Sequence, residues 1–150
     1  PAIEIFKSDM DKRANANEKF PYVCTTYSCT EHWCSGALTR WQAWLLEAMP
    51  EAYVEIGHLL AKEKRIKNGQ RVKVSSIRGE VKCVAMVTKR LTPFTVEGRT
   101  IHQVGLPFNY GWLFPKGTRD DSTNFLTPSV GDANTFCPEY KAFMVNVTKL

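Results

Sequence analysis

The chain has 150 residues, of which 43% are hydrophobic and 23% charged, an ordinary composition for a globular protein. No apolar run approaches the roughly 18 residues that a transmembrane helix needs, and no secretory signal is visible. The net charge of +5 is scattered rather than gathered in a basic stripe, so nucleic acid is not an expected partner. Scattered positive charge also suits a ligand that carries phosphate.

The first residues, Pro1–Phe20, are charged and weakly patterned, and we predict a connecting arm there, followed by one domain over residues 21–150. Because the sequence starts with Pro1 and not Met, we expect a fragment or a processed chain, and any leader would lie upstream. A domain of this size buries roughly 70% of its unfolded surface, which is enough for a core of its own.

Short segments rich in Tyr, Val and Thr predict a mainly β domain. The turns between them are marked by Asn68-Gly69, Arg78-Gly79 and Glu97-Gly98. Many short strands with close turns are typical of a small barrel or sandwich, and closure into a barrel would remove the exposed strand edges. The expected strands are Tyr22–Tyr27, Tyr53–Ile56, Gln70–Ser76, Glu80–Thr88, Phe94–Val96, Thr100–Val104 and Phe143–Val147.

Two short helices are also expected. One is Gly57–Lys64, between two predicted strands. The other is an amphipathic helix in the segment Gly36–Leu46, because apolar residues recur there at helical spacing. We expect its aromatic pair to pack into a core or against a neighbouring domain. The recurring residues are Leu38, Trp41, Trp44, Leu45 and Ala48.

Five cysteines cannot all form disulfides within one chain. Cys24, Cys29 and Cys34 lie five residues apart, with His32 between the last two. A zinc or iron–sulfur site usually contains a tighter pair such as C-x2-C. We therefore predict buried free thiols rather than metal ligands, and the redox compartment stays open.

The segment Leu126–Lys141 is polar and interrupted by Pro and Gly, so it is neither a helix nor a core strand. It precedes a predicted strand, a place where rigid scaffolds often carry binding loops. Asp132 and Asn134 supply hydrogen-bonding groups, and Gly131 lets the backbone come close to a ligand. An ordinary surface loop, with Asp132 capping its own turn, is the open alternative.

Several motifs appear in an order that is similar to a known family. They are Val87-Thr-Lys-Arg90, Thr100-Ile-His-Gln-Val-Gly-Leu-Pro107, and Ser129-Val-Gly-Asp-Ala-Asn134 followed by Pro138-Glu-Tyr-Lys-Ala142. Together they resemble the C-terminal segment of the large subunit of molybdenum- or tungsten-dependent formate dehydrogenases, from about Tyr22 to the end. The resemblance implies a double-psi β-barrel, an α+β barrel with short helices, as found in the dimethyl sulfoxide reductase class.

The ligand that this resemblance implies is bis-molybdopterin guanine dinucleotide, whose metal is molybdenum or tungsten. Its pyrophosphates need backbone amides or cations, and its rings need hydrogen bonds from polar side chains. From the residues alone, a solvated Arg40, a packed His102 and a surface pair of Glu139 with Lys141 stay open as alternatives. By resemblance, the cofactor contacts are Thr26, His32, Arg40, His102, Gln103, Asn134 and Lys141.

One stretch departs from the family pattern. Where the relatives usually carry His-Trp-Gly after Val-Gly-Leu-Pro, this chain has Phe108-Asn-Tyr-Gly111. Asn109 donates and accepts hydrogen bonds but does not titrate near neutral pH. The local pterin contact is therefore expected to differ, whereas the fold is not.

No catalytic residue and no metal ligand are expected in this chain, because nothing matches the family's His-Arg pair or its N-terminal cysteine cluster. The resemblance implies a domain that closes over the cofactor for the two-electron oxidation of formate to carbon dioxide, with an iron–sulfur cluster elsewhere in the full subunit. It also implies three features of the setting. The partners are the remaining domains and an iron–sulfur electron-transfer subunit, and the location is periplasmic, with a cytoplasmic location open as the alternative. The third feature, no direct insertion into a membrane, follows from the lack of a long apolar run. The alternative is a stand-alone β-barrel that binds a nucleotide or a protein.

Overall fold

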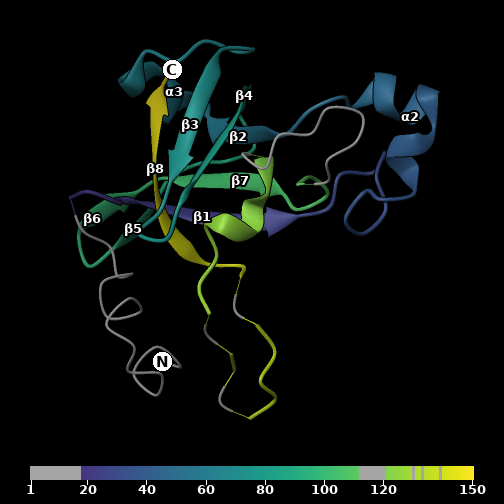
Figure 1. Ribbon diagram of the computed structural model, residues 1–150. Coiled ribbons are helices and arrows are strands. Elements are labelled where there is room, and N and C mark those ends of the chain that lie inside the picture. Colours follow the sequence, from purple (N-terminus) through teal and green to yellow (C-terminus); the bar gives the residue numbers. More distant parts are fainter. Residues whose placement is uncertain (1–17, 112–120, 130, 133, 139) are drawn as a thin grey trace.

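The computed structural model describes residues 18–111, 121–129, 131–132, 134–138 and 140–150. Within these residues, six strands close into a barrel in the order β1-β7-β2-β4-β3-β8 (Figure 1). The mainly β closed barrel with short helices that the sequence predicts is confirmed. The strands are β1 (Tyr22–Tyr27), β2 (Tyr53–Gly57), β3 (Arg71–Ser75), β4 (Glu80–Thr88), β7 (Gln103–Pro107) and β8 (Phe143–Lys149).

Both parallel and antiparallel pairs build the barrel. β1 pairs in parallel with β7, and β2 pairs in parallel with β4, while the four remaining contacts are antiparallel. Side chains alternate along each strand between the interior and the outer face. The inward positions are mostly β-branched and form one core, which includes Val54, Ile56, Val72, Val74, Val81, Cys83, Val104, Leu106, Val145 and Val147.

Short helical segments connect the strands. The helix α3 (His58–Lys64) leads from β2 toward β3, and its Leu60 and Ala61 are buried. The 3-10 turn η2 (Thr39–Trp41) and the helix α2 (Ala43–Ala48) lie between β1 and β2 and project away from the barrel (Figure 1). The 3-10 turn η4 (Thr123–Phe125) follows β7. No helix in the described part of the chain is long and apolar enough to cross a bilayer.

Two expected elements differ from the structure. The predicted strand Thr100–Val104 is divided between β6 (Arg99–Ile101), which pairs only with β5 (Phe94–Val96), and the barrel strand β7. The single amphipathic helix predicted in Gly36–Leu46 is instead η2 followed by α2. Its aromatic residues Trp41 and Trp44 are exposed, so they do not pack into this domain's core, and the other half of the expectation, packing against a neighbouring domain, stays a prediction.

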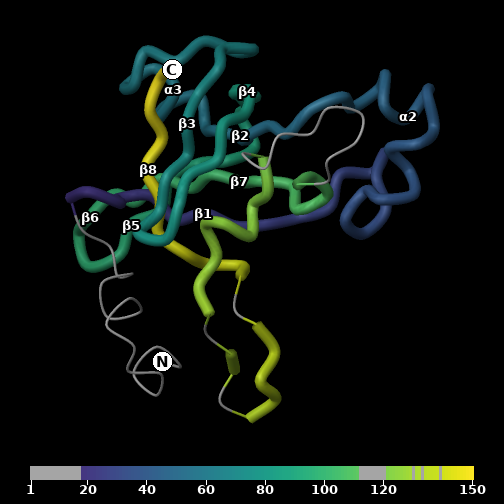
Figure 2. Tube along the Cα trace, viewed as in Figure 1, coloured from purple at the N-terminus to yellow at the C-terminus, as the bar shows by residue number. Residues whose placement is uncertain are grey.

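The chain path places two long excursions on different sides of the barrel (Figure 2). One carries α2, and the other is the segment between η4 and β8. Only the last three residues of the predicted connecting arm, 18–20, are described. There Phe20 is buried, and the backbone carbonyl of Lys19 accepts a hydrogen bond from Asn146 Nδ2 at 3.0 Å. Glu139, and with it the surface pair suggested for Lys141, lies outside the described residues.

Candidate functional site

The carboxyl ends of the parallel strands β1 and β7 bring two predicted site residues together. The Thr26 hydroxyl donates to the Tyr140 carbonyl at 2.9 Å, and Lys141 Nζ donates to the Thr26 carbonyl at 2.7 Å. Lys141 also lies 5.6 Å from the ring centre of Phe108 and 5.7 Å from that of Tyr140. The last loop is thereby attached at the end of the barrel where β1 and β7 finish, at Tyr27 and Pro107. We call this end the mouth of the barrel, and barrel mouths are a common position for ligand sites.

His32 and Arg40 form a second group, on either side of one aromatic ring. The His32 ring lies edge-on to Tyr110 with centroids 5.7 Å apart, and the Arg40 guanidinium lies 5.3 Å from the Tyr110 ring centre. His32 Nε2 donates to the Met49 carbonyl at 2.8 Å, and Nδ1 lies 3.2 Å from the Thr39 hydroxyl. Both residues are buried. The alternative that Arg40 extends into solvent is therefore excluded.

Asn109 follows β7 and binds the loop that carries His32. Its Oδ1 accepts from the Cys29 amide at 2.8 Å, and its Nδ2 lies within hydrogen-bond distance of three acceptors. These acceptors are the Ser28 hydroxyl at 2.9 Å, the His32 carbonyl at 3.0 Å and the Cys34 carbonyl at 2.7 Å. The side chain is fully buried and bonded within the protein. Asn109, where the sequence departs from the family pattern, therefore stabilises the Ser28–Cys34 loop.

His102 and Gln103 lie at the other end of the same strand pair. Gln103 is opposite Val23, whereas Pro107, at the carboxyl end of β7, is opposite Tyr27. Four residues separate the two ends, or about 13 Å at 3.3 Å per residue. His102 Nε2 is 3.5 Å from Glu63 Oε2, its ring meets Tyr22 edge-on, and Gln103 Nε2 donates to the Thr92 carbonyl at 3.0 Å.

Asn134 lies on the exposed last loop, where Asp132 organises the turn. Asp132 Oδ1 accepts from the Asn134 amide at 3.0 Å, and from the Thr135 amide and hydroxyl at 2.8 and 2.9 Å. The bonds from Thr135 and Asn134 lower the pKa of the Asp132 carboxyl. Asp132 thus has the turn-capping role that the sequence left open, while the Asn134 side chain stays exposed.

A cluster that sequence reasoning missed lies on the outer face beside the mouth. The buried Glu55 carboxylate accepts from the Tyr27 hydroxyl at 2.9 Å and from Arg90 Nε at 3.0 Å, and Arg90 Nη2 bonds its second oxygen. Burial, together with Tyr53 and Glu55, raises the pKa of Tyr27 well above its usual range. Arg90 belongs to the Val87–Arg90 motif that the sequence singled out. Its partner Glu55 could not be identified from the sequence, because it lies 35 residues away.

Gly105 makes this cluster possible. It pairs with Thr25 on one side and with Glu55 on the other. A Cβ at this position would lie 2.5 Å from Tyr27 Cε1, so any larger residue would push the tyrosine ring away from Glu55.

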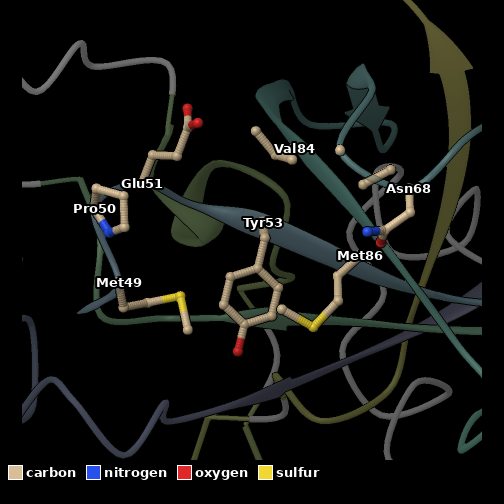
Figure 3. A pocket seen from close by; sticks show the side chains of 9 residues that line it. Met49, Pro50, Glu51, Tyr53, Asn68, Val84 and Met86 are labelled. Atoms are coloured by element: carbon tan, nitrogen blue, oxygen red, sulfur yellow. The ribbon is translucent and has the colours of Figure 1, made fainter. Parts of the chain in front are cut away.

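None of the seven predicted site residues lines the cavity shown in Figure 3. Its volume is about 200 Å³, and apolar groups from Met49, Tyr53, Val84 and Met86 dominate its lining, with Glu51 and Asn68 on the wall. Pockets for drug-sized ligands typically measure about 300–1,000 Å³ and include convergent polar groups. The cavity is therefore too small and too apolar for a dinucleotide.

The cysteines are all reduced. Cys24, Cys29 and Cys83 are buried, as predicted for free thiols, whereas Cys34 and Cys137 are exposed. Burial raises the pKa of Cys83 to about 12 and that of Cys24 well above its usual value. Both stay protonated near neutral pH and fill core positions. No group of three metal-ligating side chains occurs among the residues that the structure describes.

The arrangement around the mouth suits an anionic ligand with flat rings. Lys141 is exposed, and the described residues accept from one of its three ammonium donors, which leaves charge available at the surface. The rings of Phe108 and Tyr140 beside it offer flat apolar contact. The described residues provide recognition chemistry of this kind, and we see no nucleophile–base pair among them that would perform a reaction.

A comparison with models of known protein families gives a match over most of the chain. A family model described as "Molydopterin dinucleotide binding domain" matches residues 22–144, which include the barrel strands β1 to β7 and the first two residues of β8. This match extends from the start of β1 through the mouth and the last loop.

The similar relatives are much longer proteins. Formate dehydrogenase subunit alpha of Megalodesulfovibrio gigas is 49% identical over 139 residues, which cover 93% of this chain and 14% of that protein. Formate dehydrogenase 2 subunit alpha (cytochrome c-553) of Nitratidesulfovibrio vulgaris is 53% identical over 150 residues, covering 99% of this chain and 15% of that protein. The chain thus spans about one seventh of these relatives' length.

A solved structure shares the fold. Acetylene hydratase from Pelobacter acetylenicus superposes on 98% of this chain and 20% of its own, with a TM-score of 0.68 and 12% identity. At this identity the likeness concerns the fold alone, and it agrees with the double-psi barrel expected from the sequence.

Proposed function

Since this chain belongs to the family of molybdopterin dinucleotide-binding domains, we propose that it is the C-terminal cofactor-binding domain of a formate dehydrogenase catalytic subunit. The observation that carries this proposal is the 49–53% identity to formate dehydrogenase alpha subunits along nearly the whole chain. The full enzyme would oxidise formate to carbon dioxide with two electrons, and this domain, over residues 21–150, would hold bis-molybdopterin guanine dinucleotide.

The residues at the mouth fit this cofactor. Its pyrophosphates are anionic, and Lys141 holds a positive charge at the surface in a position set by the Thr26 carbonyl. Its flat rings match the apolar faces of Phe108 and Tyr140. When bound, the cofactor supplies the metal, molybdenum or tungsten, and with it the redox chemistry; the chain's residues bind it, orient it and exclude water.

We assign different roles to the seven predicted residues. Lys141 and Asn134, whose side chains are exposed, would contact the cofactor at the mouth. Gln103 and His102 are partly exposed about 13 Å away, at the other end of β1 and β7, and would contact a different part of it. Thr26, His32 and Arg40 are buried and bonded or packed within the protein. These three would act as positioning residues that hold the strand ends and the Ser28–Cys34 loop in shape.

The setting of the full enzyme is also part of the proposal. Electrons would leave through an iron–sulfur cluster elsewhere in the subunit and then through an iron–sulfur partner subunit. The matched relatives are themselves named as alpha subunits, which supports an enzyme of several subunits. We place it in the periplasm, as the similarity to respiratory-type enzymes suggests.

Cofactor content tests the proposal. The full-length protein is purified with Lys141→Gln, which keeps a donor for the Thr26 carbonyl but removes the charge, and with the control Lys149→Gln, on the exposed end of β8. We expect Lys141→Gln to lower the guanine dinucleotide and metal bound per subunit several-fold, while its circular dichroism spectrum stays that of the folded wild type. Lys149→Gln should match the wild type.

Two results would contradict the proposal. Equal cofactor content in the wild type and Lys141→Gln would remove Lys141 from the site. A native polypeptide of only 17.0 kDa that contains no metal would mean that the barrel is a separate nucleotide- or protein-binding module instead.

A further inference from the structure

The groups that would hold the cofactor at the mouth are attached to two consecutive residues of β1. The Thr26 hydroxyl donates to the Tyr140 carbonyl at 2.9 Å, and the Thr26 carbonyl accepts from Lys141 Nζ at 2.7 Å. The next carbonyl along the strand, that of Tyr27, accepts from the Phe108 amide at 3.0 Å. The positions of the ammonium group and of both flat rings at the mouth therefore depend on where Thr26 and Tyr27 lie.

Strand pairing alone gives this end of β1 limited support. The pairing of β1 with β8 ends at Cys24, and the last three residues of β1 continue beyond it. On its other edge β1 pairs with β7 as far as Tyr27, which lies opposite Pro107. Among the described strands, the end of β1 is thus paired on one edge only.

The side chain of Tyr27 supplies a second attachment. Its ring lies against Gly105 of β7, where a Cβ would be 2.5 Å from Tyr27 Cε1. Its hydroxyl donates to Glu55 Oε2 on β2 at 2.9 Å. Because β7 lies between β1 and β2 in the barrel, this side chain connects β1 to a strand with which it does not pair.

Glu55 is itself held in one position. Its side chain is 4% exposed, and Arg90 donates to both of its carboxylate oxygens. An ionised carboxylate accepts hydrogen bonds and donates none, so the Tyr27 hydroxyl has to be the donor. Burial raises the pKa of Tyr27, which keeps that proton in place. The contact is a charge-assisted hydrogen bond, which is roughly twice as strong as a neutral one.

We infer that Glu55 is a positioning residue of the cofactor site: through the Tyr27 hydroxyl it fixes the end of β1 to which Lys141 is bonded. This inference rests on the proposed function, because it requires a cofactor at the mouth. It gives the cluster of Tyr27, Glu55 and Arg90 a role in binding, in addition to its contribution to stability.

Loss of cofactor from the full-length holoenzyme tests this role. Tyr27→Phe removes one hydroxyl and keeps the ring, and Tyr22→Phe makes the same change in a buried tyrosine at the other end of β1. The proteins are kept in urea at a concentration where circular dichroism shows the native fold, and the released guanine nucleotide and metal are measured over time. Because a hydrogen bond to a charged group is lost, we expect Tyr27→Phe to release the cofactor about tenfold faster than the wild type. The control Tyr22→Phe should stay within about twofold of the wild type.

A double substitution separates positioning from a general loss of stability. If Tyr27 acts through the position of Lys141, removal of the ammonium group leaves Tyr27 with less to position. In the Lys141→Gln background, Tyr27→Phe should therefore speed release by about threefold or less. Release rates that equal the product of the two single effects would show that Tyr27→Phe only loosens the fold, and would contradict the inference.

Gly105→Ala tests the same contact without removing a polar group. The added methyl group would push the Tyr27 ring away from Glu55, so release should be about as fast as from Tyr27→Phe. Release at the wild-type rate from either variant would contradict the inference.

The wild-type sample keeps this inference separate from the proposed function. If the wild type contains guanine dinucleotide and the variants release it at the wild-type rate, the inference is overturned and the proposed function stands. A wild type without guanine dinucleotide would overturn both.

Discussion

At the scale of single residues, Asn109 shows how a neutral amide can organise a loop. An amide group offers two donors and one acceptor oxygen, and here they face the backbone or side chains of Ser28, Cys29, His32 and Cys34. No charge has to be buried for this, so the desolvation cost is lower than that of an ionised residue in the same place.

Asn109→Ala is therefore expected to be strongly destabilising. The substitution leaves a buried amide donor and several carbonyl acceptors without partners, each at a cost of about 1–3 kcal/mol, so we expect a total loss of about 3 kcal/mol or more. Urea unfolding of the full-length protein, with Asn124→Ala on an exposed position as control, measures this. A loss below about 0.5 kcal/mol for Asn109→Ala would show that water replaces the amide at little cost.

Other residue-scale predictions depended on context that single positions do not reveal. His32 and Arg40 were predicted as ligand contacts by resemblance to the family, and the structure adds that both pack on Tyr110 inside the protein. Asp132 was correctly recognised as a possible turn cap, because Asp, Asn and Thr in close succession form such turns from local bonds alone.

At the scale of elements, the cluster of Tyr27, Glu55 and Arg90 connects three parts of the chain. Tyr27 ends β1, Glu55 lies in β2, and Arg90 follows β4. A fork of two guanidinium donors on a buried carboxylate is among the stronger charged contacts, and here it holds the connection after β4 against the barrel. The contact fixes the position of a segment that no strand pairing reaches.

Two arginine substitutions compare a buried with an exposed ion pair. Arg90→Ala leaves the buried Glu55 carboxylate with the Tyr27 hydroxyl alone among these partners, and should lower stability by more than the loss of an exposed pair does. Arg71→Ala breaks a pair with Glu51 in which both side chains are 54% exposed, and should cost about 0–1 kcal/mol. Chemical denaturation of both variants checks this, and equal losses would contradict the assigned role of burial.

Strand prediction succeeded where alternation was clear. Glu80–Thr88 was predicted with both boundaries correct, because its apolar residues alternate and Gly79 marks its start. Thr100–Val104 was not, because the same run serves two sheets, with Arg99–Ile101 in a hairpin and Gln103–Pro107 in the barrel. The local pattern of residues does not show where an extended segment changes from one partner strand to another.

At the scale of the whole molecule, the barrel is a binding scaffold, and we predict that it is catalytically inactive alone. The purified 150-residue chain should show no formate-dependent reduction of a redox dye, whereas the full-length enzyme should. The reason is that the described residues supply recognition groups at the mouth but no reacting group. Dye reduction by the isolated chain above the rate of a buffer control would contradict this prediction.

The sequence by itself determined the fold class, most strands and the family. Alternating apolar residues identify strands because side chains on a strand alternate between two faces, and motifs in a fixed order identify a family. The polar last loop could likewise be identified from its composition.

Only the tertiary structure decided which polar residues meet. Lys141 reaches Thr26 across 115 positions, Arg90 reaches Glu55 across 35, and Asn109 reaches Cys29 across 80. Such contacts depend on strand order and barrel closure, which local sequence patterns do not encode. The same holds for Trp41 and Trp44: helical spacing predicted an apolar stripe, but only the path of the chain leaves both side chains exposed outside the barrel.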